Sequence, residues 1–161
     1  MARYKVALIG LYNYKVLGVR YLTSSLRERG FDCDLICFKN FESGNMKKPS
    51  EKEYDYILNL LRDLKPDVIG LSVMSSLYLE VPRELTRRIR ASVGPDTPII
   101  WGGVYPTLFP AESLDYADWV LRGESEEALV ELVEHLERGE NPRHLLNLAY
   151  RQDGQTVVND V

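Results

Sequence analysis

The sequence predicts an α/β fold of the doubly wound, Rossmann- or flavodoxin-like class, with a five-stranded parallel sheet in the order 2-1-3-4-5 and a C-terminal β-hairpin. First, short apolar runs alternate along the chain with amphipathic helical segments. Second, these runs are apolar at consecutive positions, which is typical of strands covered on both faces. Third, Asp153-Gly154 lies between two extended runs near the C-terminus, which is a strong hairpin signal.

The strands are predicted where β-branched and other apolar residues follow one another without interruption. They cover residues 5–11, 32–39, 67–74, 98–103 and 119–123. The fourth of these ends on the glycine pair Gly102-Gly103, after which we expect the chain to turn through Tyr105, Pro106 and Thr107.

The helices are predicted from apolar stripes at helical spacing, and glycine or proline follows closely after each one. They cover residues 16–29, 50–65, 82–93 and 125–138. Ser50, with Glu53 three residues later, predicts a capping box. Ser125 is expected to cap the last helix, with Glu126 and Glu127 placed where the helix dipole favours anions.

The length of 161 residues predicts one domain over residues 1–140, followed by a hairpin or linker over 141–161. Charged residues make up 27% of the chain and the net charge is −4, so we expect no nucleic-acid partner. No apolar run approaches the ~20 residues that span a bilayer, so membrane insertion is not expected. Cys33 and Cys37 are predicted to be buried thiols in a reducing cytoplasm.

In the predicted strand order, a ligand crevice opens at the carboxyl ends of strands one and three, with strand four beside them. The candidate binding residues lie in the segments that follow four of the strands, because those segments converge there. They are Tyr12, Asn13, Lys15, Gly18, Ser72, Met74, Ser75, Gly102, Gly103, Val104, Tyr105, Pro106, Thr107, Gly123 and Glu124.

Several familiar kinds of site are excluded by their motifs. The dinucleotide-binding G-x-G-x-x-G, the P-loop and the G-x-S-x-G nucleophile elbow do not occur. A phosphoacceptor site would need carboxylates where Asn13, Lys15 and Ser72 stand, and Glu124 alone offers no acid–base pair. We therefore expect no catalytic residue and no metal ligand, and a crevice that holds a large, mostly apolar ligand. The glycine pair would let a flat group approach the backbone.

The loops resemble those of the cobalamin-binding (vitamin B12) domain family. Its members carry D-x-H-x-x-G after strand one, S-x-L after strand three and G-G after strand four. Gly18, Ser72 and the glycine pair match, and methionine replaces the leucine at position 74. Lys15 stands where the family's cobalt-ligating histidine would lie, and Asn13 replaces its aspartate partner. The resemblance therefore implies base-off cobalamin without an amino-acid ligand to cobalt.

The chain is most similar to the N-terminal domains of B12-dependent radical S-adenosylmethionine enzymes. Shared features are GGxxPT at residues 102–107, Gly123-Glu124, and a trailing YR..G at residues 150–154. The resemblance implies a dimethylbenzimidazole tail between sheet and helices and a corrin over the strand ends. It also implies a following catalytic domain in the same longer chain, with a [4Fe-4S] cluster and S-adenosylmethionine. That domain would perform methyl transfer or radical ring chemistry, and this chain alone would have no activity.

Two other hypotheses remain open at this point. One is a non-catalytic, Rossmann-like interaction domain whose crevice is vestigial. The other is an enzyme that acts on a different nucleotide-like ligand, which the absence of phosphate-loop motifs disfavours. Individual residues also have structural interpretations: the glycine pair can make a tight exit from the strand, and Tyr12 and Tyr105 can cover the end of the sheet.

Overall fold

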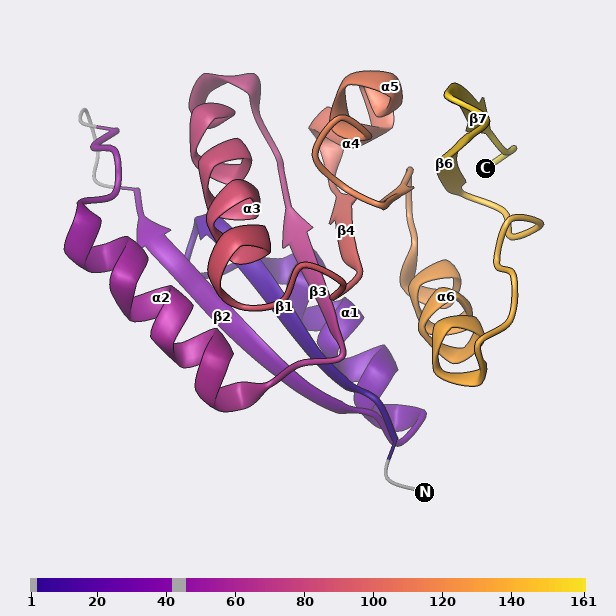
Figure 1. The fold of residues 1–161 in the computed structure, drawn as a ribbon, viewed down its shortest axis with the longest axis horizontal. Coiled ribbons are helices and arrows are strands. Elements are labelled where there is room, and N and C mark those ends of the chain that lie inside the picture. Colours follow the sequence, from indigo (N-terminus) through magenta and orange to yellow (C-terminus); the bar gives the residue numbers. More distant parts are fainter. Residues whose placement is uncertain (1–2, 42–45) are drawn as a thin grey trace.

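The computed structural model describes residues 3–41 and 46–161, which form a seven-stranded sheet with helices on both faces (Figure 1). The strands are β1 (Lys5–Tyr12), β2 (Asp32–Asn40), β3 (Val68–Ser72), β4 (Ile99–Gly102), β5 (Trp119–Leu121), β6 (Leu148–Gln152) and β7 (Gln155–Val158). The helices are α1 (Leu17–Glu28), α2 (Glu51–Leu64), α3 (Glu80–Ser92), α4 (Val104–Leu108), α5 (Pro110–Ser113) and α6 (Glu126–Arg138), with a 3₁₀ turn η1 (Ser76–Tyr78).

The sheet has the order β2-β1-β3-β4-β5-β6-β7, and its first five strands are parallel. The predicted order 2-1-3-4-5 is thus confirmed, but five strands is an underestimate. The predicted hairpin joins the same sheet, because β6 runs antiparallel to β5 and β7 pairs with β6. Its turn residues Asp153 and Gly154 both have positive φ, as a two-residue hairpin turn requires.

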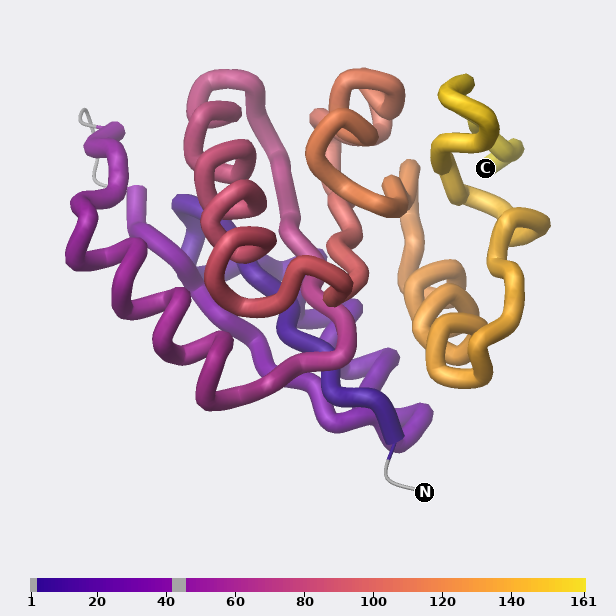
Figure 2. Tube along the Cα trace, viewed as in Figure 1, coloured from indigo at the N-terminus to yellow at the C-terminus, as the bar shows by residue number. Residues whose placement is uncertain are grey.

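The hairpin also contacts the helical segment that follows β4. Arg151 donates a hydrogen bond to the carbonyl of Ala111 at 3.2 Å and forms an ion pair with Asp115. Figure 2 shows this C-terminal segment, in yellow, beside α5 at the carboxyl-terminal end of the parallel strands. The hairpin is therefore attached to the domain by side-chain contacts as well as by strand pairing.

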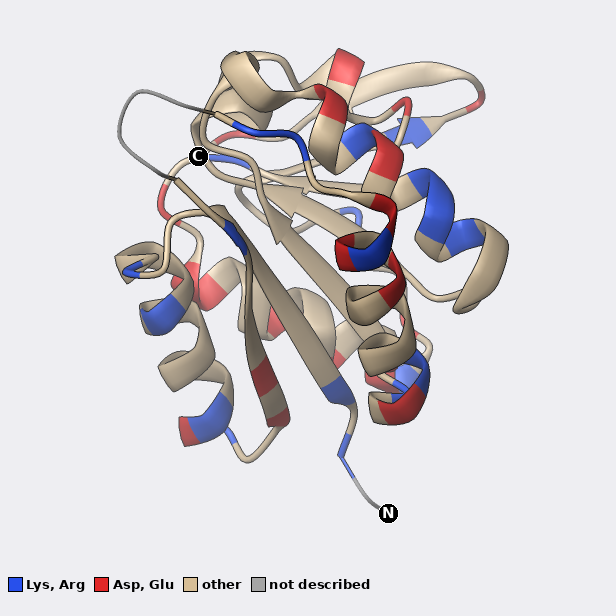
Figure 3. Ribbon diagram, turned by 90° about the vertical axis from the view of Figure 1, so that its left-hand side faces the viewer, with Lys and Arg blue, Asp and Glu red and all other residues tan. Residues whose placement is uncertain are grey.

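Two apolar cores lie on opposite faces of the sheet. Alternate strand residues face opposite ways, so Ile69 and Leu71 of β3 pack with α2 and α3, whereas Val68 packs with α1 and α6. Basic and acidic residues are mixed along the helices, while the strands are largely uncharged (Figure 3). In the described residues no helix has the length and apolar character needed to cross a membrane.

The predicted N-cap hydrogen bonds form at the start of α2 but not at the start of α6. The predicted capping box of α2 is confirmed, since Ser50 accepts from the Glu53 amide and donates its own amide to the Glu53 carboxylate. Ser125 occupies the N-cap position of α6, but its side chain makes no cap hydrogen bond. The turn expected after Gly103 is instead the short helix α4, whose first turn tolerates Pro106 because that proline would have no intrahelical donor to lose.

The two cysteines differ in their environments. Both are free thiols, as expected from their spacing. Cys33 is buried, and burial raises the pKa of its thiol to about 11. The expectation that Cys37 is also buried is wrong, because it lies near the end of the edge strand β2, where its side chain is exposed.

The core on the α3 side is organised by Trp101, which is fully buried and stacks on Tyr116 with ring centroids 5.5 Å apart. Its indole Nε1 donates to the Thr86 hydroxyl at 3.1 Å. We expect Thr86→Val to lower the free energy of unfolding by about 1–3 kcal/mol, because the buried indole donor would lose its acceptor. Urea denaturation measures this, and Thr86→Ser, which keeps the hydroxyl, should lose less. Equal stability of Thr86→Val and wild type would contradict the argument.

Candidate functional site

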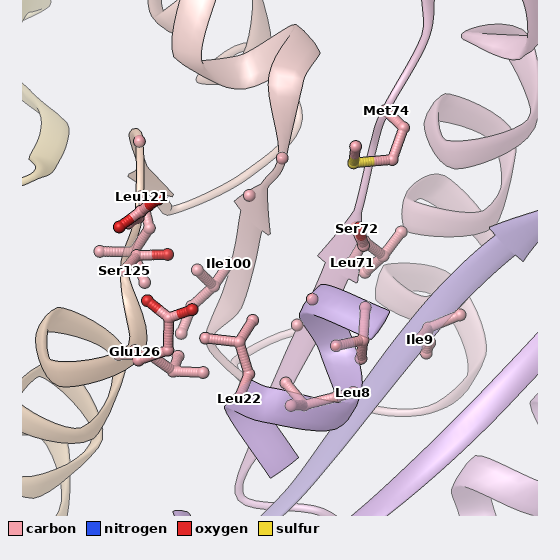
Figure 4. Close-up of a pocket in the computed structure, with 18 residues that line it drawn as sticks. Leu8, Ile9, Leu22, Leu71, Ser72, Met74, Ile100, Leu121, Ser125 and Glu126 are labelled. Atoms are coloured by element: carbon pink, nitrogen blue, oxygen red, sulfur yellow. The ribbon is translucent and has the colours of Figure 1, made fainter. Parts of the chain in front are cut away.

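A cavity of about 230 Å³ lies at the carboxyl ends of the parallel strands, between the sheet and helices α1 and α6 (Figure 4). Seven predicted site residues line it: Gly18, Ser72, Met74, Gly102, Gly103, Gly123 and Glu124. The other lining residues are Leu8, Ile9, Val19, Leu22, Gly70, Leu71, Ile100, Leu121, Ser125, Glu126 and Leu129. The walls are therefore mainly apolar, with a few polar groups.

Glycines account for much of the open space. A Cβ at Gly18, in the first turn of α1, would meet no heavy atom within 4 Å. A Cβ at Gly102 would meet only the carbonyl oxygen of Leu121, at 3.8 Å. Gly70 is on the same face of the sheet, but the space of its missing side chain is taken by Leu8, whose Cδ2 would lie 2.7 Å from a Cβ there. The cavity thus exists because side chains are missing on both α1 and the sheet.

Gly103 has a different role from Gly102. Its φ is +107°, and a Cβ there would lie 2.8 Å from the carbonyl oxygen of Val73. This close approach allows the Val73 amide to donate to Gly102 at 2.8 Å and the Tyr105 amide to donate to Val73 at 3.1 Å. Of the two glycines, Gly102 leaves space for a ligand, and Gly103 permits the backbone geometry that joins the two loops.

Thr107 ties the loop after β4 to the loop after β5. Its hydroxyl donates to the carbonyl of Gly103 at 2.8 Å and accepts from the amide of Gly123 at 2.9 Å. The loop after β5 is also held by Asn147, whose side-chain amide donates to the carbonyls of Arg122 and Glu124. The rim of the cavity is therefore held by hydrogen bonds from α4 and from the segment before β6.

Three predicted residues at and just after the end of β1, Tyr12, Asn13 and Lys15, lie outside the cavity. A register shift between Leu11 and Tyr12 turns the Tyr12 ring into the core on the α2 and α3 side of the sheet. There its ring centroid lies 4.9 Å from that of Tyr78. Its hydroxyl donates to the carbonyl of Lys47, and burial raises its pKa. Asn13 and Lys15 are exposed, and the Asn13 side chain accepts from the Lys15 amide at 2.9 Å, which shapes the turn.

The other predicted residues in the segments after β3 and β4 do not line the cavity. Ser75 accepts from the Leu77 amide and so begins η1. Tyr105 is buried and donates to Glu112 at 2.8 Å, and burial raises its pKa. Pro106 is likewise buried, whereas Val104 is exposed on α4. With Thr107, these residues support the loops and do not line the cavity.

The lining residues that were not predicted fall into two groups. The apolar ones, such as Leu8 and Ile100, are indistinguishable in sequence from residues that face a filled core. Gly70, inside an apolar strand, did carry a signal, because glycine there marks a close approach or an open space. Ser125 and Glu126 were interpreted only as the start of α6, although both also face the cavity.

We expect Thr107→Val to release the loop after β5, because the Gly123 amide would lose its acceptor. Hydrogen exchange at this amide should accelerate while the exchange of core strand amides changes little. Thr107→Ser keeps the hydroxyl and is the matched control. Unchanged protection of the Gly123 amide in Thr107→Val would show that the loop is held by other contacts.

Comparison with known proteins shows which family the chain resembles. Residues 8–133 match the B12 binding domain family. The chain is 29% identical over 147 residues to an anaerobic magnesium-protoporphyrin IX monomethyl ester cyclase of Cereibacter sphaeroides, covering 87% of this chain and 22% of the relative. It is 25% identical over 142 residues to the uncharacterized methyltransferase PH0819 of Pyrococcus horikoshii, covering 86% and 28%. The chain thus spans less than a third of these relatives.

Solved structures share the fold. The cobalamin-dependent S-adenosylmethionine radical enzyme OxsB with aqua-cobalamin bound has a TM-score of 0.75 at 22% identity, over 98% of this chain and 22% of that one. The radical S-adenosylmethionine methyltransferase TsrM from Kitasatospora setae, with cobalamin and a [4Fe-4S] cluster bound, has a TM-score of 0.74 at 18% identity, over 99% and 29%.

Proposed function

The chain belongs to the B12 binding domain family, and on this premise we propose that its cavity holds the nucleotide tail of cobalamin in the base-off form. The dimethylbenzimidazole ring would lie between the sheet and helices α1 and α6, with the corrin over the carboxyl ends of the strands. The observation that carries the proposal is the cavity at this position, bounded by Gly18 on one side and Gly102 on the other.

The size and lining of the cavity fit this part of the cofactor. Pockets for drug-sized ligands measure roughly 300–1,000 Å³, so a cavity of about 230 Å³ suits a portion of a larger ligand. Its apolar walls match a methylated bicyclic ring, and Ser72 supplies a hydroxyl that can donate to a ring nitrogen. A vestigial crevice would instead be filled by the chain's own side chains, so the open cavity favours cofactor binding over the interaction-domain hypothesis.

We propose further that no side chain of this domain ligates cobalt. Lys15 occupies the position of the family's histidine, and its side chain is exposed to solvent. The ammonium group of an exposed lysine is a strongly hydrated positive charge and has no lone pair to offer a metal. His135 lies on α6 and His144 beyond it, so neither belongs to the loops around the cavity.

The greater length of the relatives supports a proposal about the whole protein. This domain would work with a radical S-adenosylmethionine domain that carries a [4Fe-4S] cluster, for methyl transfer or ring formation. Apolar side chains exposed in the helical segments that follow the strands, including Leu17 of α1, Leu77 of η1 and Leu108 of α4, offer that domain a surface. Residues 141–161 would form the hairpin that leads toward it. The two free thiols agree with a cytoplasmic location.

The cavity proposal is tested with Gly18→Leu. The new side chain would project into the open space and displace the ligand, while loss of a helical glycine should stabilise the fold by about 1 kcal/mol. After incubation with hydroxocobalamin and desalting, wild type should retain the cobalamin absorbance and Gly18→Leu should not. Ser24→Leu, on the exposed part of the same helix, is the control and should retain it. Retention by Gly18→Leu would place the ligand elsewhere.

The absence of a side-chain cobalt ligand is tested separately with Lys15→Ala. We expect the visible spectrum of the retained cobalamin to stay that of the base-off form, because the lysine makes no bond to the metal. Absorption spectroscopy of the desalted complex measures this. A large spectral shift on substitution would mean that Lys15 does contact cobalt.

A further inference from the structure

Glu126 places a carboxylate in the wall of an otherwise apolar part of the cavity. It belongs to the first turn of α6, and Figure 4 shows its side chain turned toward Leu22 of α1 and Ile100 of β4. Leu121 and Leu129 line the cavity beside it. Among the hydrogen bonds and ion pairs formed within residues 3–41 and 46–161, none involves the Glu126 side chain.

A ligand in this cavity removes water from the carboxylate. A charged group that loses its water without gaining a hydrogen-bond donor opposes binding strongly. A ligand that presents an O–H or N–H group to Glu126 therefore binds better than one that presents only apolar atoms. The side chains of Leu22, Ile100 and Leu129 have no such donor.

The proposed ligand offers few such groups. Dimethylbenzimidazole in cobalamin has no N–H or O–H, whereas the ribose attached to it carries free hydroxyls. The phosphate beyond the ribose is an anion, and the cavity lining contains Glu124 and Glu126 but no lysine or arginine. Electrostatic repulsion thus disfavours the phosphate at this point.

The position of Glu126 near the mouth of the cavity is where the ribose of the proposed ligand would lie. Helix α6 begins at the carboxyl edge of the sheet, shortly after β5 ends. Leu129, almost one helical turn further along, therefore lies further from that edge than Glu126 does. A tail that enters base-first would place its ring at the level of Leu129 and Ile100, and its ribose near Glu126. Resting on the proposed function, we propose that Glu126 accepts a hydrogen bond from a ribose hydroxyl and selects corrinoids that carry a ribonucleotide.

Glu126 also lies in the first turn of α6, where the helix dipole stabilises any carboxylate. This electrostatic effect on helix stability needs a control. Glu127 is in the same first turn of α6, carries the same charge and is exposed outside the cavity. Methionine matches glutamate in length and helix propensity and has no strong acceptor. Comparing Glu126→Met with Glu127→Met therefore separates the cavity contact from the dipole.

The first measurement is the Kd of hydroxocobalamin by titration calorimetry. Glu126→Met should bind roughly 10- to 100-fold more weakly than wild type, as expected for loss of a hydrogen bond to a charged group. Glu126→Gln, which keeps a neutral acceptor, should fall between them, and Glu127→Met should match wild type. Wild-type affinity in Glu126→Met would overturn the inference and leave the proposed function standing. Failure of wild type to bind cobalamin would overturn both.

The second measurement assigns the donor to the ribose with two cobalt-free probes, α-ribazole and 1,5,6-trimethylbenzimidazole. A methyl group replaces the ribose in the second probe, so neither ring carries an N–H. Ligand-observed NMR should show that wild type binds α-ribazole more tightly than the N-methylated base. Glu126→Met should remove this preference, whereas Glu127→Met should keep it. No advantage of α-ribazole over the base in wild type, or an advantage that persists in Glu126→Met, would overturn the inference.

Discussion

The close approach of two backbones at the ends of β3 and β4 is the constraint on which the site depends. The Val73 amide reaches the carbonyl of Gly102, and the Val73 carbonyl accepts from the Tyr105 amide, because residue 103 has no Cβ. This linkage fixes where α4 begins. It thereby sets the position of Thr107, whose hydroxyl binds the loop after β5. One glycine thus connects three of the segments around the cavity.

The two faces of the sheet are packed differently near the carboxyl ends. On the face toward α3, Trp101 fills the core and finds a hydrogen-bond acceptor in Thr86. On the face toward α1 and α6, the neighbouring residue is Gly102, and Gly70 lies on the adjacent strand. A rigid, filled core on one face supports an open space on the other. The low compressibility of a close-packed core holds the sheet in place behind that space.

The features that could be predicted from sequence are those encoded locally. Apolar runs gave the parallel strands, Ser50 and Glu53 gave the capping box, and Asp153-Gly154 gave the hairpin. The Asp-Gly pattern indicates a hairpin but not the strand with which it pairs, so the pairing of β6 with β5 stayed open. Likewise, the register shift that turns Tyr12 into the opposite core leaves no pattern in the chain. At the site, glycines were identifiable because a missing side chain is informative, whereas Leu8 and Ile100 resemble any core residue.

The pairing of β7 gives the end of the described chain a definite location. The backbone carbonyl of Asp160 accepts a hydrogen bond from the backbone amide of Asn147. Val161 lies beside Gly123 at the rim of the cavity. Under the proposed function, a catalytic domain connected through the hairpin would be tethered beside the cofactor cavity, and a short linker would give each partner a high effective concentration near the other. Encounter between cofactor and reaction centre would then require no large excursion of either domain.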